Sequence, residues 1–175
     1  MVKVVELKRK ICLIGDWGVG KTSLIRKFVF DQFDDKYIST LGTKVSKKRI
    51  QFKVAENEII DMNLMIWDIM GQEEFRKIQL MSYKNANGAI LVCDLTRKET
   101  LNNITKWRSD LFSVATEIPI IILGNKSDLT EKIQFNANEL AEIAKEYNVE
   151  SYITSAKTGE NVEKSFINIG MKLME

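Results

Sequence analysis

Short apolar runs alternate with helix-like patterns along the 175 residues of the chain. Alternating Met62, Leu64 and Ile66 indicate a strand with one buried face, whereas the unbroken apolar run 89–95 indicates a strand buried on both faces. Apolar residues at helical spacing lie between such runs. The predicted strands are 11–14, 43–54, 59–67, 89–95, 119–123 and 151–154. The predicted helices are 22–30, 101–112, 140–147 and 162–173.

This alternation predicts an α/β fold. Strands separated by crossover-length helices form right-handed βαβ units, which give a mostly parallel sheet with helices on both faces. The polar turn 56–58 joins two strands directly and predicts one antiparallel edge strand in a six-stranded sheet. We expect a single domain over residues 1–175. Ligands of such folds bind beyond the carboxyl ends of the strands, so the residues after each strand are the candidate site.

The first predicted strand ends in GDWGVGKT, residues 15–22, which matches the phosphate-binding pattern G-x-x-x-x-G-K-[ST]. Backbone N–H groups of such a loop point at phosphate oxygens, in conformations that glycine adopts at little cost. Lys21 supplies a cation for the β- and γ-phosphates, Thr22 supplies a hydroxyl for Mg²⁺, and the following helix adds its positive end. The predicted phosphate-binding residues are Gly18, Val19, Gly20, Lys21, Thr22 and Ser23.

The third strand ends in Trp67-Asp68-Ile69-Met70-Gly71-Gln72. Asp68 is a candidate second anchor for Mg²⁺, through a water molecule. Gly71 offers an N–H to a terminal phosphate with no side chain in the way. Gln72 carries a neutral amide that could orient a water for in-line attack on that phosphate.

Two further loops predict guanine as the base. Asp128 of the segment Asn125-Lys126-Ser127-Asp128 can accept two N–H bonds from guanine, which adenine cannot supply. Lys126 can lay its stem across the base, and Asn125 can tie two loops together. After the sixth strand, the small residues of Ser155-Ala156-Lys157 let a backbone N–H reach the guanine carbonyl. An ATPase or kinase is therefore disfavoured.

Composition removes several other classes of protein. The chain has no histidine, which excludes Ser-His-Asp chemistry, Cys-His chemistry and most zinc enzymes. Cys12 and Cys93 lie in apolar runs and are expected to be buried, reduced core residues. The net charge of +2 points to no particular partner. No apolar stretch approaches the ~20 residues that span a bilayer, and the N-terminus lacks a signal-peptide pattern, so we expect a cytoplasmic protein.

The four loop segments, in this order, resemble the Ras superfamily of small GTPases over about residues 10–174, and the Rab type most of all. The segment 37–42, YISTLG, adds to the resemblance. It implies the three-layer P-loop GTPase fold, or G domain, with bound GTP or GDP and Mg²⁺. It also implies that Thr40 binds Mg²⁺ and the γ-phosphate, that Phe33 stacks near the guanine and that Tyr37 contacts the nucleotide. Catalysis would then depend on Lys21, Thr40 and Gln72.

Proteins of this type act as timers whose two switch regions change when the γ-phosphate leaves. The switches here would be about 33–43 and 68–83, read by effectors, exchange factors and GTPase-activating proteins. The resemblance implies slow hydrolysis in a monomer that binds no nucleic acid. The alternative is a nucleotide-locked binding module with negligible hydrolysis. The printed chain ends at Glu175 without a prenylation motif, so membrane attachment requires a lipidated tail outside this sequence.

Two bulky residues depart from the family pattern. Trp17 stands where relatives carry glycine or a small polar residue, close to the γ-phosphate. We predict that its ring lies outside the phosphate cradle, partly exposed or against a switch, and that it hinders an arginine supplied by an activating protein. Met70 replaces a small residue beside Gly71. It could turn Gln72 away from the attacking water or pack beneath the second switch, and we favour packing.

The expected effector surface also departs from the Rab pattern. Trp67 is present, but Val45 and Ser82 stand where aromatic residues are usual. The run 44–49, KVSKKR, is unusually basic. We interpret it as a solvated edge strand that discourages aggregation. An acidic partner or a membrane surface is the alternative, and nucleic acid is disfavoured because aromatic residues are not interleaved with the basic ones.

Overall fold

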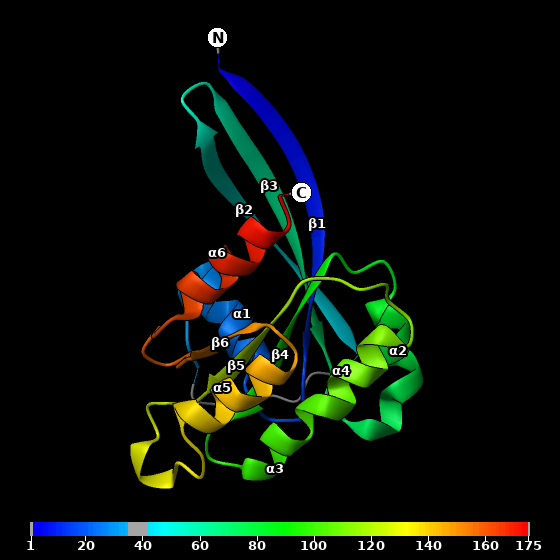
Figure 1. The fold of residues 1–175 in the computed structure, drawn as a ribbon, viewed down its shortest axis with the longest axis vertical. Coiled ribbons are helices and arrows are strands. Elements are labelled where there is room, and N and C mark those ends of the chain that lie inside the picture. Colours follow the sequence, from blue (N-terminus) through cyan, green and yellow to red (C-terminus); the bar gives the residue numbers. More distant parts are fainter. Residues whose placement is uncertain (1, 35–41, 175) are drawn as a thin grey trace.

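The computed structural model describes residues 2–34 and 42–174. Within these residues, six strands form one sheet in the order β2-β3-β1-β4-β5-β6 (Figure 1). All neighbouring pairs are parallel except β2 and β3, which form an antiparallel hairpin at one edge. The strands are β1 (Lys3–Ile14), β2 (Thr43–Ala55), β3 (Glu58–Ile69), β4 (Gly88–Asp94), β5 (Ile120–Asn125) and β6 (Glu150–Ile153). The predicted fold class is confirmed.

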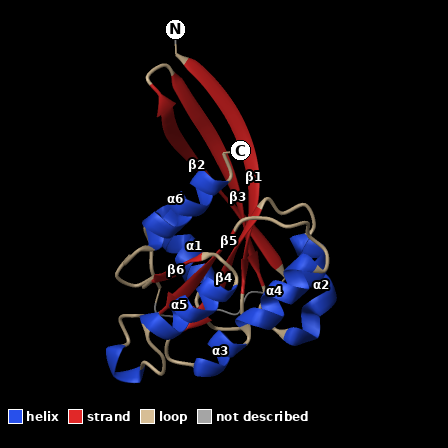
Figure 2. Cartoon of the chain, in the orientation of Figure 1, coloured by secondary structure: helices blue, strands red, loops and turns tan. Residues whose placement is uncertain are grey.

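Helices cover both faces of the sheet (Figure 2). One core cluster packs α1 and α6 against Ile11 and Leu13 of β1. The other packs α3, α4 and α5 against Cys12 and Ile14, which point to the opposite face because side chains alternate along a strand. The helices are α1 (Lys21–Phe30), α2 (Arg76–Tyr83), α3 (Lys98–Asn102), α4 (Ile104–Phe112), α5 (Ala137–Glu146) and α6 (Val162–Lys172). None of the helices in the described part of the chain has the length and apolar character that crossing a membrane would require.

Apart from shifts of one to three residues at element ends, the sequence-based elements differ from the structure in three places. Strand β1 begins at Lys3 instead of residue 11, because β3 offers a complete partner from Glu58 onward. The helix predicted over 101–112 is interrupted at Asn103, which separates α3 from α4. Helix α2 was not predicted, since its segment has too few regularly spaced apolar residues.

Strands β1, β2 and β3 extend together beyond the helices and carry the N-terminus at their far end (Figure 1). The basic run 44–49 lies on β2, at the open edge of the sheet, where Lys44, Lys47 and Arg49 are exposed. The predicted position at a solvated sheet edge is confirmed. Cys12 and Cys93 are buried free thiols, also as predicted.

Candidate nucleotide-binding site

A cleft of about 280 Å³ opens beyond the carboxyl ends of β1, β3 and β5. Most residues predicted to bind nucleotide line it: Gly18, Gly20, Lys21, Thr22, Ser23, Phe33, Gly71, Asn125, Lys126, Asp128, Ala156 and Lys157. Gln72, Trp17 and Met70 line it as well. Val19 and Ser155 are buried behind the surface, and Tyr37 and Thr40 lie outside the described residues. Four loops far apart in sequence thus meet where the sheet topology predicts a ligand.

The phosphate loop needs glycine at positions 18 and 20. Gly18 has φ of 75° and Gly20 has φ of 104°, in the left-handed region that other residues adopt at a cost. A Cβ at Gly20 would also lie 2.3 Å from Nδ2 of Asn125. Helix α1 begins at the next residue, so its unsatisfied N–H groups face the cleft. The loop is therefore shaped to receive an anion.

Lys21 brings a buried cation into this loop. Its Nζ donates hydrogen bonds to the carbonyl oxygens of Gly15, at 2.6 Å, and Asp16, at 2.8 Å. Burial, which disfavours the charged form, lowers the pKa of Lys21 to about 8, although the Asp68 and Asp16 carboxylates act in the opposite direction. A poorly solvated ammonium of this kind interacts strongly with an incoming phosphate.

Thr22 and Asp68 are brought together from α1 and β3. The Thr22 hydroxyl donates to Oδ2 of Asp68 at 2.6 Å, and Asp68 is buried. A hydroxyl and a carboxylate are hard oxygen ligands of the kind that Mg²⁺ prefers. The described residues contain no cluster of three or more histidine, cysteine or acidic side chains that could hold a metal. The oxygen atoms of Thr22 and Asp68 fit Mg²⁺, which commonly keeps waters and phosphate oxygens as its other ligands.

The segment after β3 lies directly against the phosphate loop. A Cβ at Gly71 would lie 2.5 Å from the backbone N of Trp17 and 2.5 Å from the carbonyl oxygen of Gly15. Gln79 on α2, which the sequence did not single out, donates from Nε2 to the carbonyl oxygens of Met70, at 2.9 Å, and Gln72, at 2.8 Å. Met70 itself is 4% exposed, as expected of a residue that packs beneath the second switch.

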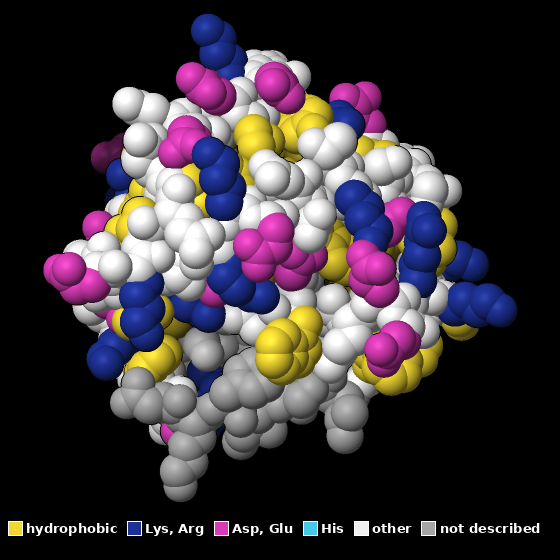
Figure 3. Space-filling model, turned by 90° about the horizontal axis from the view of Figure 1, so that it is seen from below, with side chains coloured by type: hydrophobic (Ala, Val, Ile, Leu, Met, Phe, Trp, Pro, Cys, Tyr) yellow, Lys and Arg dark blue, Asp and Glu magenta, His cyan; other side chains and the backbone are white. Residues whose placement is uncertain are grey.

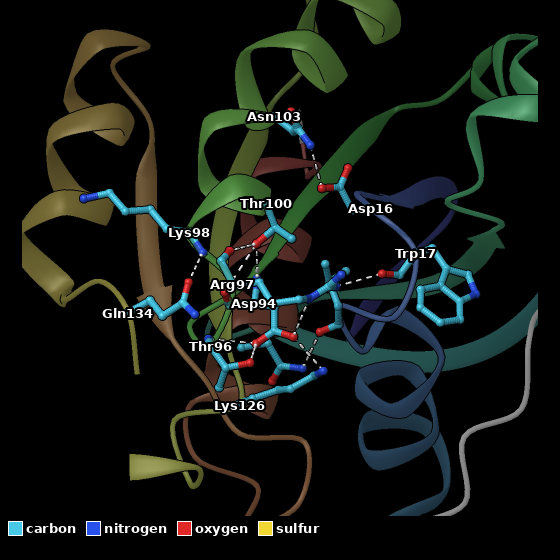
Figure 4. Close-up of polar contacts among 12 residues, drawn as sticks. Asp16, Trp17, Asp94, Thr96, Arg97, Lys98, Thr100, Asn103, Lys126 and Gln134 are labelled. Carbon is cyan, nitrogen blue, oxygen red and sulfur yellow. Dashed lines mark hydrogen bonds and ion pairs between the residues drawn. The ribbon is translucent and has the colours of Figure 1, made fainter. Parts of the chain in front are cut away.

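Trp17 is 47% exposed at the rim of the cleft, which confirms the prediction of a partly exposed ring. Its backbone is held separately, because Nη2 of Arg97 donates to the Trp17 carbonyl oxygen at 2.8 Å. In Figure 4 the ring points away from the polar network that surrounds Arg97. The Trp17 ring is therefore directed away from the contacts that hold its own backbone.

Asn125 ties the base-reading loops to the phosphate loop, as predicted. Its Nδ2 donates to the Val19 carbonyl oxygen at 3.0 Å, and its Oδ1 accepts from the Ala156 N–H at 3.3 Å. The Ser155 hydroxyl donates to Oδ1 of Asp128 at 2.6 Å. Val19 and Ser155 thus contribute from behind the cleft by holding the residues that line it.

Asp94 at the end of β4 is a supporting residue that the sequence analysis missed. Its buried carboxylate pairs with Nζ of Lys126 at 2.7 Å and accepts two hydrogen bonds from Thr96 (Figure 4). Burial alone would raise the pKa of Asp94, but hydrogen bonds from Lys126 and Thr96 outweigh it and lower the pKa. The rule applied to the other strand ends would have found Asp94, because β4 is also a parallel strand of the sheet.

The face of the molecule seen from below carries cations and anions interspersed with apolar side chains (Figure 3). Neither sign of charge dominates that face, in keeping with the small net charge. Recognition in the cleft therefore depends more on individual side chains and backbone groups than on a long-range electrostatic field of one sign.

Comparison with known proteins gives a consistent result. The family model described as "Ras family" matches residues 10–175. Ras-related protein Rab-27B of Rattus norvegicus is 34% identical over 176 residues, covering 95% of this chain and 81% of that protein. Ras-related protein Rab-8B of Homo sapiens is 36% identical over 177 residues, covering 99% and 82%. GTP-binding protein ypt1 of Schizosaccharomyces pombe is 36% identical over 169 residues, covering 95% and 80%.

Proposed function

This chain belongs to the Ras family as a Rab-like small GTPase, and from that premise we propose that it is a GTP/GDP switch with slow intrinsic hydrolysis. The observation that carries the proposal is the convergence of Lys21, the Thr22–Asp68 pair and Asp128 on one cleft or its immediate wall. Lys21 matches a phosphate chain, the Thr22–Asp68 pair matches its magnesium ion, and Asp128 matches guanine.

Guanine recognition belongs to Asp128 in this proposal. The Ser155 hydroxyl occupies one side of the carboxylate and fixes its direction. The carboxylate then accepts the N1–H and 2-amino donors of guanine, which adenine lacks. Lys126 covers one face of the base, while Phe33 and Tyr37 contribute from the first switch.

The triphosphate lies over the phosphate loop, where Lys21 and the loop N–H groups neutralise its charge. Thr22, Thr40 and Asp68 would hold Mg²⁺, Asp68 through a water molecule. When bound, Mg²⁺ neutralises charge on the β- and γ-phosphates. The N–H of Gly71, together with Thr40, would read the presence of the γ-phosphate.

Hydrolysis is an in-line attack by water, in which an oxygen–phosphorus bond forms at the γ-phosphorus as the bond to the β–γ bridging oxygen breaks. GDP and inorganic phosphate leave. Gln72 orients the water. In this class of enzyme, positioning and charge stabilisation supply most of the rate enhancement. Without an arginine supplied by a partner protein, the hydrolysis rate is lower by a factor of ~10³–10⁵. The isolated protein is therefore slow.

A single-turnover assay tests the proposal. The protein is loaded with GTP and Mg²⁺, and GDP formation is followed by chromatography beside Gln72→Leu. Conversion within hours by the wild type, with markedly slower conversion by the variant, supports the timer. Intact GTP in both proteins would instead support the nucleotide-locked module, which is motivated by the bulky Trp17 and Met70 at the cleft.

Trp17 gives the proposal a second test. We expect it to obstruct an arginine inserted by an activating protein, because its exposed ring stands at the rim of the cleft. Trp17→Gly should then increase stimulation by such a protein. Strong stimulation of the wild type, with no gain in the variant, contradicts this.

The switch regions 33–43 and 68–83 would be read by effector, exchange-factor and activating proteins. We propose that residues 1–175 act as one monomeric domain that binds no nucleic acid. Its expected place is the cytoplasm, or the cytoplasmic face of a membrane if a lipidated tail is attached.

A further inference from the structure

Residues 94–107 do not line the cleft, but they contact residues on both of its sides. Its Asp94 pairs with Lys126 on the base side. On the phosphate side, Asn103 and Trp107 donate to the two carboxylate oxygens of Asp16, at 2.8 and 2.6 Å. One segment therefore holds both halves of the nucleotide site from outside.

Arg97 joins these two halves. Its Nη2 donates to the Trp17 carbonyl oxygen at 2.8 Å, and its Nε donates to Oδ2 of Asp94 at 3.2 Å (Figure 4). The same Asp94 oxygen pairs with Nζ of Lys126. The chain of contacts therefore runs from the phosphate loop through a guanidinium and a buried carboxylate to the base-flanking lysine.

The charges and geometry indicate that Arg97 and Asp94 hold the Trp17 peptide and the Lys126 side chain together. We call this set of contacts the clamp. A planar guanidinium donates in two fixed directions at once, so it can hold a carbonyl and a carboxylate together in a way that an ammonium cannot. The Asp94 side chain is 1% exposed, and this burial strengthens its attraction to both cations. The Arg97 side chain is 32% exposed, so solvent weakens the pairing without removing it.

Arg97 is also close enough to influence the phosphate site. It lies within 3.7 Å of the position that a Cβ on Gly18 would take, and its charge is among those that lower the pKa of Lys21.

We propose that Arg97 is a positioning residue that sets how long the protein retains its nucleotide. It fixes the Trp17 peptide and, through Asp94, the Lys126 side chain, so release requires the two halves to separate against this clamp. The proposal rests on guanine-nucleotide binding as the function of the cleft. Removing the clamp should speed release of GDP and GTP alike, because it touches neither switch.

The test uses the full chain loaded with the fluorescent nucleotide mantGDP and chased with excess GDP. We expect Arg97→Ala to release mantGDP about five- to tenfold faster than the wild type. Arg97→Lys keeps the positive charge but loses the planar arrangement of N–H donors. Its release of mantGDP should therefore be about two- to threefold faster than that of the wild type. Lys98→Ala is the matched control, because Lys98 is the next residue and pairs with Glu139 on the surface.

Thermal unfolding of each nucleotide-free variant separates retention from general stability. Faster release by Arg97→Ala, with its unfolding temperature and the release rate of Lys98→Ala unchanged, supports the clamp. Release within twofold of the wild type, or equal acceleration by Lys98→Ala, overturns it. If Arg97→Ala does not fold, Arg97→Lys decides, and wild-type release then overturns the clamp. Failure of the wild type to bind mantGDP would overturn the proposed function and the clamp together.

Discussion

At the scale of single residues, Gly71 shows how closely two backbones approach at the cleft. The atoms that a Cβ would meet at 2.5 Å belong to the backbone of residues 15–17, so no side-chain rotation can make room. Contact between the second switch and the phosphate loop therefore depends on the absence of a side chain.

We predict that Gly71→Ala separates the second switch from the phosphate loop. Hydrolysis in the single-turnover assay should slow by about tenfold or more, since one lost interaction of ~1.4 kcal/mol corresponds to that factor. GDP binding should persist, because base and loop contacts remain. Glu74→Ala, an exposed position in the same segment, is the control. Wild-type hydrolysis by Gly71→Ala would show that the close approach is dispensable.

At the scale of elements, α5 has a complete capping box at its start. Oδ1 of Asn136 accepts from the N–H groups of Asn138 and Glu139, and Oε2 of Glu139 accepts from the Asn136 N–H at 2.9 Å. These bonds satisfy N–H groups that have no partner inside the helix.

Asn136→Ala should lower the free energy of unfolding by about 1 kcal/mol. The unfolding temperature should then fall by about 2–4 °C, which calorimetry or circular dichroism can measure. Asn138→Ala, two residues further along and also exposed, is the control and should change little. An equal loss of unfolding free energy in both variants would mean that the loss comes from replacing an asparagine at either position, and that the capping hydrogen bonds do not contribute.

The β2–β3 hairpin contains an ion pair that makes stability depend on pH. Nε of Arg49 donates to Oδ1 of Asp61 at 2.7 Å, and its Nη2 contacts Oδ2. The hydrogen bond from Arg49 is the main cause that lowers the pKa of Asp61, followed by an opposing effect of burial. The folded protein therefore binds this proton more weakly than the unfolded chain, where the pKa of aspartate is about 3.9.

The contribution of Asp61 should be complete above about pH 5 and disappear as the pH falls below about 4. We predict that Asp61→Asn unfolds at a lower temperature than the wild type at pH 7, and that the difference narrows in acid. Glu56→Gln at the exposed hairpin turn serves as the control. A difference that stays constant down to pH 3 would contradict this origin.

At the scale of the whole molecule, the phosphate loop depends on a helix far away in sequence. The Trp107 indole on α4 is buried and donates to Oδ1 of Asp16 at 2.6 Å, across 91 residues of chain. Packing of α4 on the sheet is thus coupled to the shape of the loop that holds phosphate.

Trp107→Phe keeps an aromatic ring in the core but removes this donor. Leaving the acceptor with one fewer bond should cost about 1–3 kcal/mol in the free energy of unfolding, measured by denaturant titration. Release of mantGDP should also accelerate. Trp67→Phe, which changes a half-buried tryptophan on the hairpin, is the matched control. If the free energy of unfolding and the rate of mantGDP release both stay at wild-type values, the hydrogen bond between Trp107 and Asp16 does not couple α4 to the phosphate loop.

Much of the architecture was predictable because the signals were local. Apolar runs marked the strands, and the sheet topology required that the ends of β1, β3, β5 and β6 meet. The first part of β1 was missed because residues 3–10 are mostly polar and form a strand only against β3. The break at Asn103 was missed because apolar spacing continues across it.

Motif spacing alone indicated which side chains could face a nucleotide. Lys21, Thr22, Asp68 and Asp128 occur in motifs whose spacing follows from the chemistry of phosphate, magnesium and guanine. The tertiary structure alone decided what supports them. Arg97 reaches the Trp17 carbonyl across 80 residues, and Asp94 reaches Lys126. Such contacts have no local pattern, because they depend on how β4 and the following helices pack behind the cleft, and packing is set by the whole core.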